Sequence, residues 1–235
     1  MINLLDPTVV ITRMFESGKF DEMLNYCKKI LDSNPNDMVG LQNSALALLH
    51  LGEFEDSIHY CDKVLKIKPL DTYALKNKIY SLEQLRRYDE VLIYCKIILD
   101  LDSNDIWALN SMGLSLNELD RHKEALEFYD KALKLNNKDT TALMNKAISL
   151  SHLGNYEESI EYYDKAQMVD SNLHEASIAK SQIYEKLGME DEAFLAAQGV
   201  LIKDTILIKT NAKKNKCSIF HQFCQNEFDV LNNKK

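Results

Sequence analysis

Apolar residues recur along the chain at the spacing of one helical face. Met23, Cys27, Ile30 and Leu31 stand at i, i+4, i+7 and i+8, which places them on one side of an α-helix. Two further copies of this stripe follow at intervals of 34 residues. The pattern predicts a set of amphipathic helices that each bury the same face.

The periodicity extends over most of the chain. Six blocks of 34 residues follow one another without insertion, at 4–37, 38–71, 72–105, 106–139, 140–173 and 174–207. Position 11 of the blocks holds Met14, Leu48, Leu82, Leu116, Leu150 and Tyr184, and position 19 is Asp or Glu throughout. Self-similarity sustained over six blocks indicates a repeat architecture, in which each unit buries its apolar face against its neighbours.

Each block is predicted to hold two helices. An aspartate precedes the first helix, where its carboxylate caps free N–H groups and favours the positive end of the helix dipole. These aspartates are Asp37, Asp71, Asp105 and Asp139. A glycine near position 15 ends the first helix in four blocks, and Pro35 and Pro69 stop the second helix in the first two.

This pattern resembles the tetratricopeptide-repeat (TPR) family. The segments that carry the resemblance are "LHLGEFEDSIHYCDKVLKIKP" (49–69), "MGLSLNELDRHKEALEFYDKALKL" (112–135) and "LSHLGNYEESIEYYDKAQ" (150–167). It covers residues 4–207 and implies an all-α fold, a right-handed superhelical α-solenoid of antiparallel helix pairs. The chain departs from the family in having Leu where position 4 is commonly Trp, in lacking Pro at position 32 of the later blocks, and in a sixth block that weakens after Val200.

The evenly spaced Cys27, Cys61 and Cys95 are predicted to be core residues. Blocks with Cys at position 24 have Ile or Val at position 27, whereas blocks with Tyr at position 24 have Ala there, so the local volume is conserved. Equivalent helices of stacked pairs lie about 8–10 Å apart, which is too far for a disulfide or a shared zinc ion.

Composition and charge favour a soluble, cytoplasmic protein. The apolar run "TVVI" is too short for a signal peptide, and no segment is long enough to span a membrane. The net charge is −8, but residues 209–235 carry +4, which leaves −12 for the remaining 208 residues. Such an acidic body argues against nucleic acid as a ligand.

The resemblance implies peptide binding in a concave groove lined by the first helices. The implied groove residues are Asn43, Tyr73, Lys76, Asn77, Tyr80, Trp107, Ser111 and Asn145. The asparagines stand at position 6, where the family commonly uses an amide to hydrogen-bond an extended peptide, although they could instead cap local backbone. Tyr73 and Trp107 share position 2 of adjacent blocks and are typical anchors, the alternative for Trp107 being a half-buried packing role.

One subfamily binds the C-terminal carboxylate of heat-shock chaperones through a two-carboxylate clamp of lysine, asparagine and arginine residues. The corresponding positions of the third to fifth blocks hold Lys76, Tyr80, Ser111, Thr141 and Asn145. Only Lys76 matches, so the sequence argues against this ligand. The acidic candidates of the groove are Glu16, Glu83, Glu118, Glu175 and Glu185.

The segment 208–235 lies outside the period. "KTNAKKNK" is predicted to be a basic linker, and "CSIFHQFCQNEFDVL" to be an amphipathic helix with an apolar stripe of Phe220, Phe223, Cys224, Phe228 and Leu231. We expect this helix to cap the last block, the alternative being a docking segment for another chain or an anionic membrane surface. Cys217, His221 and Cys224 share a helical face but lack a fourth zinc ligand, so no metal site is predicted.

The sequence contains no nucleophile elbow, phosphate-binding glycine loop or H-E-x-x-H motif. We therefore expect no enzyme activity and no cofactor. The favoured function is a protein–protein interaction scaffold that binds an extended segment of a partner protein. The alternative is a regulatory or accessory subunit of an enzyme or secretion complex, and a weaker one is a metal- or thiol-sensing protein. The partner and the oligomeric state cannot be read from the sequence.

Overall fold

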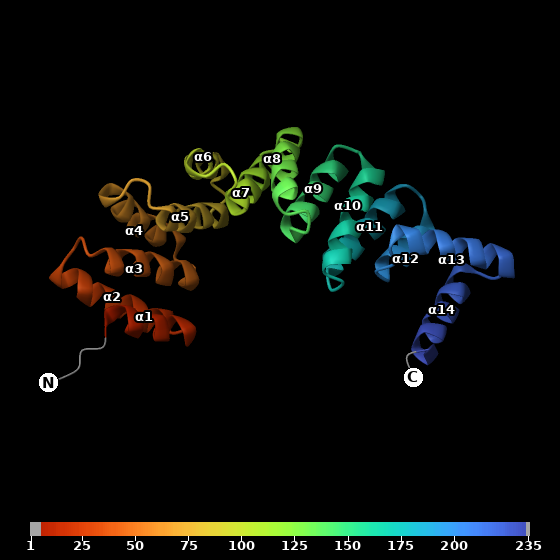
Figure 1. Cartoon of the computed structure of the whole chain (residues 1–235), viewed down its shortest axis with the longest axis horizontal. Coiled ribbons are helices and arrows are strands. Elements are labelled where there is room, and N and C mark those ends of the chain that lie inside the picture. Colours follow the sequence, from red (N-terminus) through yellow and green to blue (C-terminus); the bar gives the residue numbers. More distant parts are fainter. Residues whose placement is uncertain (1–5, 234–235) are drawn as a thin grey trace. The chain divides into compact units, whose positions relative to one another are not determined.

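The computed structural model describes residues 6–233, and side chains up to residue 226. The described chain is built from helices alone, in the order drawn in Figure 1. The helices are α1 Pro7–Glu16, α2 Phe20–Ser33, α3 Met38–Leu51, α4 Phe54–Ile67, α5 Thr72–Gln84, α6 Tyr88–Leu101, α7 Ile106–Glu118, α8 His122–Leu135, α9 Thr140–His152, α10 Tyr156–Val169, α11 His174–Lys186, α12 Glu190–Ala197, α13 Ile202–Asn215 and α14 Ile219–Asn233.

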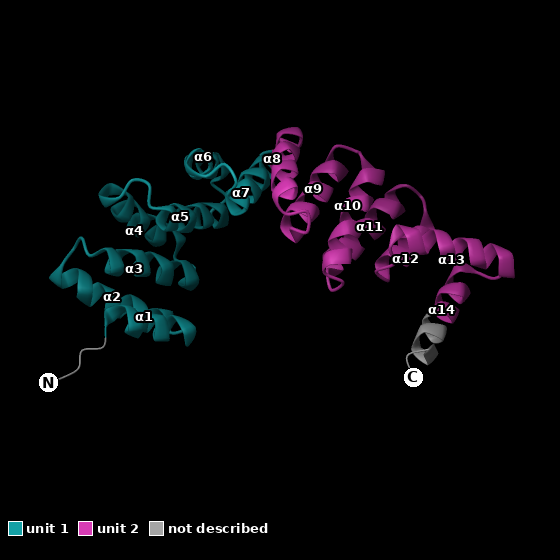
Figure 2. Cartoon of the chain, viewed as in Figure 1, with its two compact units in different colours: residues 1–119 teal, residues 120–235 magenta. Residues whose placement is uncertain are grey.

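The helices form two compact units, residues 1–119 and 120–235, which are coloured separately in Figure 2. In unit 1, consecutive helices pack on one another from α1 to α7, and α3 also packs on α5. In unit 2 the same holds from α8 to α12, with α13 packed on α10 and α14. The first five 34-residue blocks each hold one pair of helices, as the period predicts, so the fold is all-α and of the solenoid class.

The predicted aspartate caps are in place. The Asp37 carboxylate accepts from the Gly40 N–H at 2.8 Å, and Asp71, Asp105 and Asp139 make the equivalent bond to an alanine N–H three residues on. Each bond satisfies one of the free N–H groups at a helix start. The aspartates thus fix where the first helix of a block begins.

The turn between the helices of a block needs a left-handed residue. Gly52 and Gly154 supply it with φ of 79° and 80°. The third and fourth blocks lack glycine there, and Arg86 and Asp120 take φ of 57° and 58° instead. The geometry of the pair therefore persists where the glycine signal is lost, at a cost of about 1 kcal/mol for each residue.

The core confirms the interpretation of the cysteines. Cys27, Cys61 and Cys95 are fully buried free thiols. At the same block position in unit 2, Tyr129 and Tyr163 are also buried. Position 27 of these blocks holds the buried Ala132 and Ala166. A large side chain at position 24 is thus matched by a small one at position 27, which keeps the volume of the core.

The sixth block differs from the others. Its second helix, α12, ends at Ala197, and Gly199 turns the chain with φ of 78° into α13. The basic linker expected at 209–216 does not form, because residues 209–215 are the second half of α13. The missed signal is the stripe of Thr205, Ile208 and Ala212, which the structure buries.

The C-terminal helix α14 packs on α13 and reaches α12 through aromatic contacts. Phe220 and Phe223 lie 5.7 and 5.8 Å, ring to ring, from Phe194 of α12. The side chains of Phe228 and Leu231, also expected in this stripe, lie outside the described residues. Among the described helices, none is long and apolar enough to cross a membrane.

Candidate functional site

The first helices of unit 1 present an aromatic and amide surface. It comprises Tyr73, Lys76, Asn77 and Tyr80 of α5 and Trp107 of α7, and we call it the unit 1 face. Tyr73 and Tyr80 are 44% and 42% exposed, and Trp107 is half-buried. Large aromatic side chains left in water are typical of binding surfaces, because they offer much contact area with few rotatable bonds.

Lys76 joins the two helices of this face. Its Nζ lies 2.7 Å from Asp105, the capping residue of α7, and 5.2 Å from the centre of the Trp107 ring. Gln42 of α3 makes the equivalent link to Asp71, the cap of α5, at 3.2 Å. In the second and third blocks, position 5 therefore ties the first helix to the next first helix, and the Lys76 ammonium is already paired.

The two asparagines of unit 1 differ. Asn43 Nδ2 donates to the Val39 carbonyl at 2.8 Å, which is the local backbone bond considered as the alternative. Asn77 Nδ2 is enclosed and makes no well-formed hydrogen bond within the described residues. It has only a weak contact with the Tyr73 hydroxyl, which opposes the rise that burial causes in the pKa of Tyr73. A poorly satisfied buried amide costs up to about 1–3 kcal/mol, so of these two asparagines Asn77 is the one that would gain from an outside acceptor.

Ser111 does not lie on the exposed surface. It is 7% exposed, and its hydroxyl hydrogen-bonds the half-buried carboxyl of Glu83, across the α5–α7 contact. Burial raises the pKa of Glu83 to about 7, although the Ser111 bond opposes the shift. Ser111, predicted as a groove residue, therefore offers little surface to a ligand, because it is nearly buried and its hydroxyl is engaged by Glu83.

Asn145 lies on α9 and belongs to unit 2, where it is half-buried. It is therefore not part of the unit 1 face. Unit 2 has a hollow of about 250 Å³ on its own first helices, lined by Ile148, His152, Gln182 and Lys186 among others. His152 stacks on His122 with ring centres 4.5 Å apart, and burial together with His152 lowers the pKa of His122.

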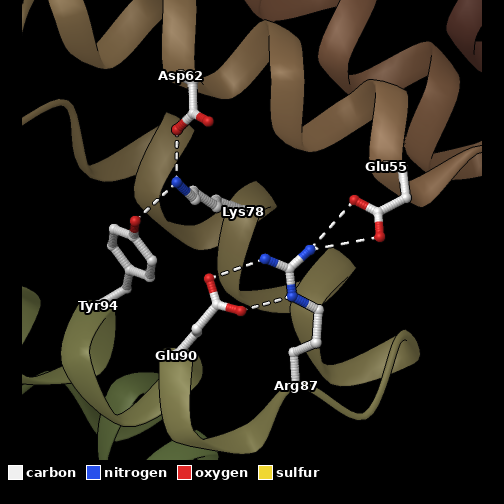
Figure 3. A network of polar contacts seen from close by, with 6 residues as sticks. All are labelled: Glu55, Asp62, Lys78, Arg87, Glu90 and Tyr94. Carbon is white, nitrogen blue, oxygen red and sulfur yellow. Dashed lines mark hydrogen bonds and ion pairs between the residues drawn. The ribbon is translucent and has the colours of Figure 1, made fainter.

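A buried charge network was missed by the sequence analysis. Lys78 is 6% exposed and donates to Asp62 at 2.5 Å and to the Tyr94 hydroxyl at 2.7 Å (Figure 3). The same view shows Arg87 bonded to Glu55 and Glu90, at the start of α6. The signal was available, since Asp at position 25 of a block is followed by Lys at position 7 of the next.

No metal centre emerges from the described residues, which include no group of three His, Cys, Asp or Glu side chains placed to hold an ion. The Cys217 thiol instead donates to Gln222 Oε1 at 3.7 Å, and Cys224 is exposed. The unit 1 face offers aromatic contact area and hydrogen-bonding groups, the features by which a protein surface binds a partner.

The chain was compared with known proteins. The model of the Psidin N-terminal TPR repeats region matches residues 49–159, and no curated protein matches. MamA from Desulfovibrio magneticus RS-1 has a similar structure, with 20% identity over 71% of this chain and 94% of that one and a TM-score of 0.67. A tetratricopeptide-repeat protein from Parabacteroides merdae gives 18% identity, 81% and 75% coverage and a TM-score of 0.72.

YrrB, described as a TPR protein with an unusual peptide-binding site, is 20% identical over 74% of this chain and 89% of its own, with a TM-score of 0.59. At such identities these neighbours establish the fold alone. The fold is one whose extended surfaces serve protein–protein interaction. The 34-residue helix pairs, the repeat model that matches residues 49–159 and the shared architecture show that the chain has the helical repeats and the fold of tetratricopeptide-repeat proteins.

Proposed function

We propose that the protein is a non-enzymatic scaffold whose unit 1 face binds an extended segment of a partner protein. The observation that carries this proposal is the exposed pair Tyr73 and Tyr80 on α5, with the poorly satisfied Asn77 amide between them. A backbone carbonyl of an extended segment would supply the acceptor, and the two rings would pack against its side chains.

The spacing along α5 suits this role. Residues three and four apart are neighbours on a helix surface, so Tyr73, Asn77 and Tyr80 follow one another along one side of α5. The peptide-binding site reported for YrrB shows that a protein of this fold can bind a peptide. Lys76 is engaged by Asp105 and has a supporting role, as does Asn43 with its local bond.

The proposal is tested by selecting random peptides displayed on phage against the purified protein and measuring their affinity by calorimetry. A variant carrying Tyr73→Ser and Tyr80→Ser should lose most of the binding. The matched control is Ile93→Ser, which removes a 59% exposed apolar side chain from a second helix of the same unit. If no peptide is selected, or if both variants bind as the wild type does, the proposed function is wrong.

A further inference from the structure

Glu83 is the one side chain of α5 whose charge the fold leaves uncompensated. It lies three residues after Tyr80 on α5 and is half-buried against α7. Its Oε1 atom is enclosed and accepts no hydrogen bond from the residues that the structure describes. A carboxylate oxygen in that state is costly, because it has lost water without gaining a donor.

Basic residues of α5 and of the turn that follows it are paired elsewhere. Lys76 pairs with Asp105 at 2.7 Å, and Arg86 lies 3.3 Å from Glu118. Within the described residues, no ion pair forms at Glu83. The two adjacent first helices of unit 1 carry Leu49 and Asn117 at the same block position, so the helix pair itself does not demand a carboxylate here.

Tyr80 provides a second element of the same site. Side chains at i and i+3 lie on the same side of a helix, so the exposed Tyr80 ring and Glu83 share one side of α5. A guanidinium can stack on an aromatic face and bind a carboxylate through two parallel hydrogen bonds. The chain also has a net charge of −8, which attracts a positively charged partner segment.

We propose that the partner segment carries an arginine that stacks on Tyr80 and pairs with Glu83. This inference rests on the proposed function, since it names the chemistry of the ligand that the unit 1 face takes. The cation supplies the donor that Glu83 Oε1 lacks, while the segment's backbone meets Asn77 Nδ2. A lysine ammonium matches the charge of Glu83, but it cannot stack flat on the Tyr80 ring or donate two parallel N–H bonds to the carboxylate. Arginine does both and is therefore preferred.

The test repeats the selection of random peptides displayed on phage with three proteins: wild type, Glu83→Gln and Glu161→Gln. Gln keeps the shape of Glu83 without its charge, and Glu161 is an exposed carboxylate on α10 that serves as the matched control. Wild type and the Glu161 variant should enrich arginine at one register, and the Glu83 variant should lose that enrichment. Replacing the arginine of a selected peptide by glutamine should weaken binding to the wild type about tenfold or more, and to the Glu83 variant hardly at all.

Two results would overturn the inference. One is the selection of peptides with no basic preference, and the other is an arginine preference that survives Glu83→Gln. Both leave the proposed function standing, because peptides are still selected on the unit 1 face. Failure of the proposed function appears differently, as the absence of any selected peptide or as binding that ignores Tyr73→Ser and Tyr80→Ser. The glutamine peptide needs no protein variant, so the result does not depend on the folding of a mutant.

Discussion

Lys78 of α5 and Asp62 of α4 form an ion pair of 2.5 Å across the contact between the second and third blocks. The relationship recurs in unit 2 as Lys146 with Asp130 at 2.5 Å and Lys180 with Asp164 at 2.6 Å. Where position 25 is a lysine instead, as at Lys28 and Lys96, position 7 of the next block is uncharged. The two positions thus vary together, as expected of side chains that meet between neighbouring blocks.

Removal of Asp62 should destabilise unit 1. Asp62→Ala leaves the 7% exposed Lys78 side chain with only the Tyr94 hydroxyl. Because Asp62 itself is partly exposed, we expect a loss of about 2 kcal/mol in the free energy of unfolding, below the range for fully buried pairs. The double variant Asp62→Ala with Lys78→Met should recover most of that loss. Urea unfolding measures both, and a double variant as unstable as the single one would show that the pair is not the cause.

The thiols should divide into two classes. Cys27, Cys61 and Cys95 are fully buried, and burial raises the pKa of Cys27 to about 11 and that of Cys61 to about 12. Reactive thiolate is therefore scarce and inaccessible at neutral pH. In the native protein a thiol reagent should label Cys224 first and these three only on unfolding, as mass spectrometry of labelled peptides can show. Rapid native labelling of all three would contradict the packing.

The stacked pair His122 and His152 should make unit 2 less stable in acid. Burial and the neighbouring His152 lower the pKa of His122, although Asp120, with an oxygen 3.8 Å from Nε2, opposes the shift. The unfolded chain therefore binds the proton more readily, so this stability is present above about pH 6.5 and is lost as the pH falls below it.

The control for this pair is built into the chain. In the first two blocks the equivalent stack is Phe20 on His50, also at 4.5 Å. His122→Phe recreates that stack without a second titrating ring. Urea unfolding at pH 7.5 and 5.5 should show a smaller acid loss for this variant than for the wild type, and an equal loss would exclude His122 as its source.

Glu83 should have the opposite pH dependence. Its pKa is raised to about 7 by burial, and the groups that face it, the Ser111 hydroxyl and the Cys95 thiol, carry no charge near neutral pH. The folded state holds this proton more tightly than the unfolded chain, so stability falls as the pH rises from about 4.5 to 7. Glu83→Gln should then be more stable than the wild type at pH 8, by about 2 kcal/mol. A variant that is less stable at pH 8 would refute this account.

Asn77 and Asn43 form a matched pair for the binding proposal. Asn77→Ala should weaken a selected peptide by about 1 kcal/mol, the net value of one hydrogen bond, with the melting temperature preserved. Asn43→Ala should leave the affinity unchanged, because Asn43 Nδ2 already donates to Val39. Calorimetry of both variants separates the two roles, and equal effects would remove Asn77 from the site.

The helix pairs, their aspartate caps and the buried cysteines could be predicted because each depends on residues close in the sequence or on the repeat period. The residues of the Lys78–Asp62 pair recur at fixed block positions, so a signal was present, but inferring a contact from it requires knowing which faces of neighbouring blocks meet. The left-handed Arg86 and Asp120 were missed for a different reason: the backbone of the pair imposes φ > 0 where no glycine marks the turn. Eight groove residues were predicted, and burial and local bonds now separate Ser111 and Asn43 from Tyr73, Asn77 and Tyr80.

Trp107 offers the most direct test of the central claim, that the unit 1 face binds an extended segment of another protein. It is the only tryptophan of the chain and lies on that face beside Lys76. A selected peptide without tryptophan is titrated into the protein while the emission of Trp107 is recorded. The account predicts a saturable change in emission that matches the calorimetric affinity and disappears with Tyr73→Ser and Tyr80→Ser. Calorimetric binding that leaves the emission unchanged and is equally tight for that variant would contradict it.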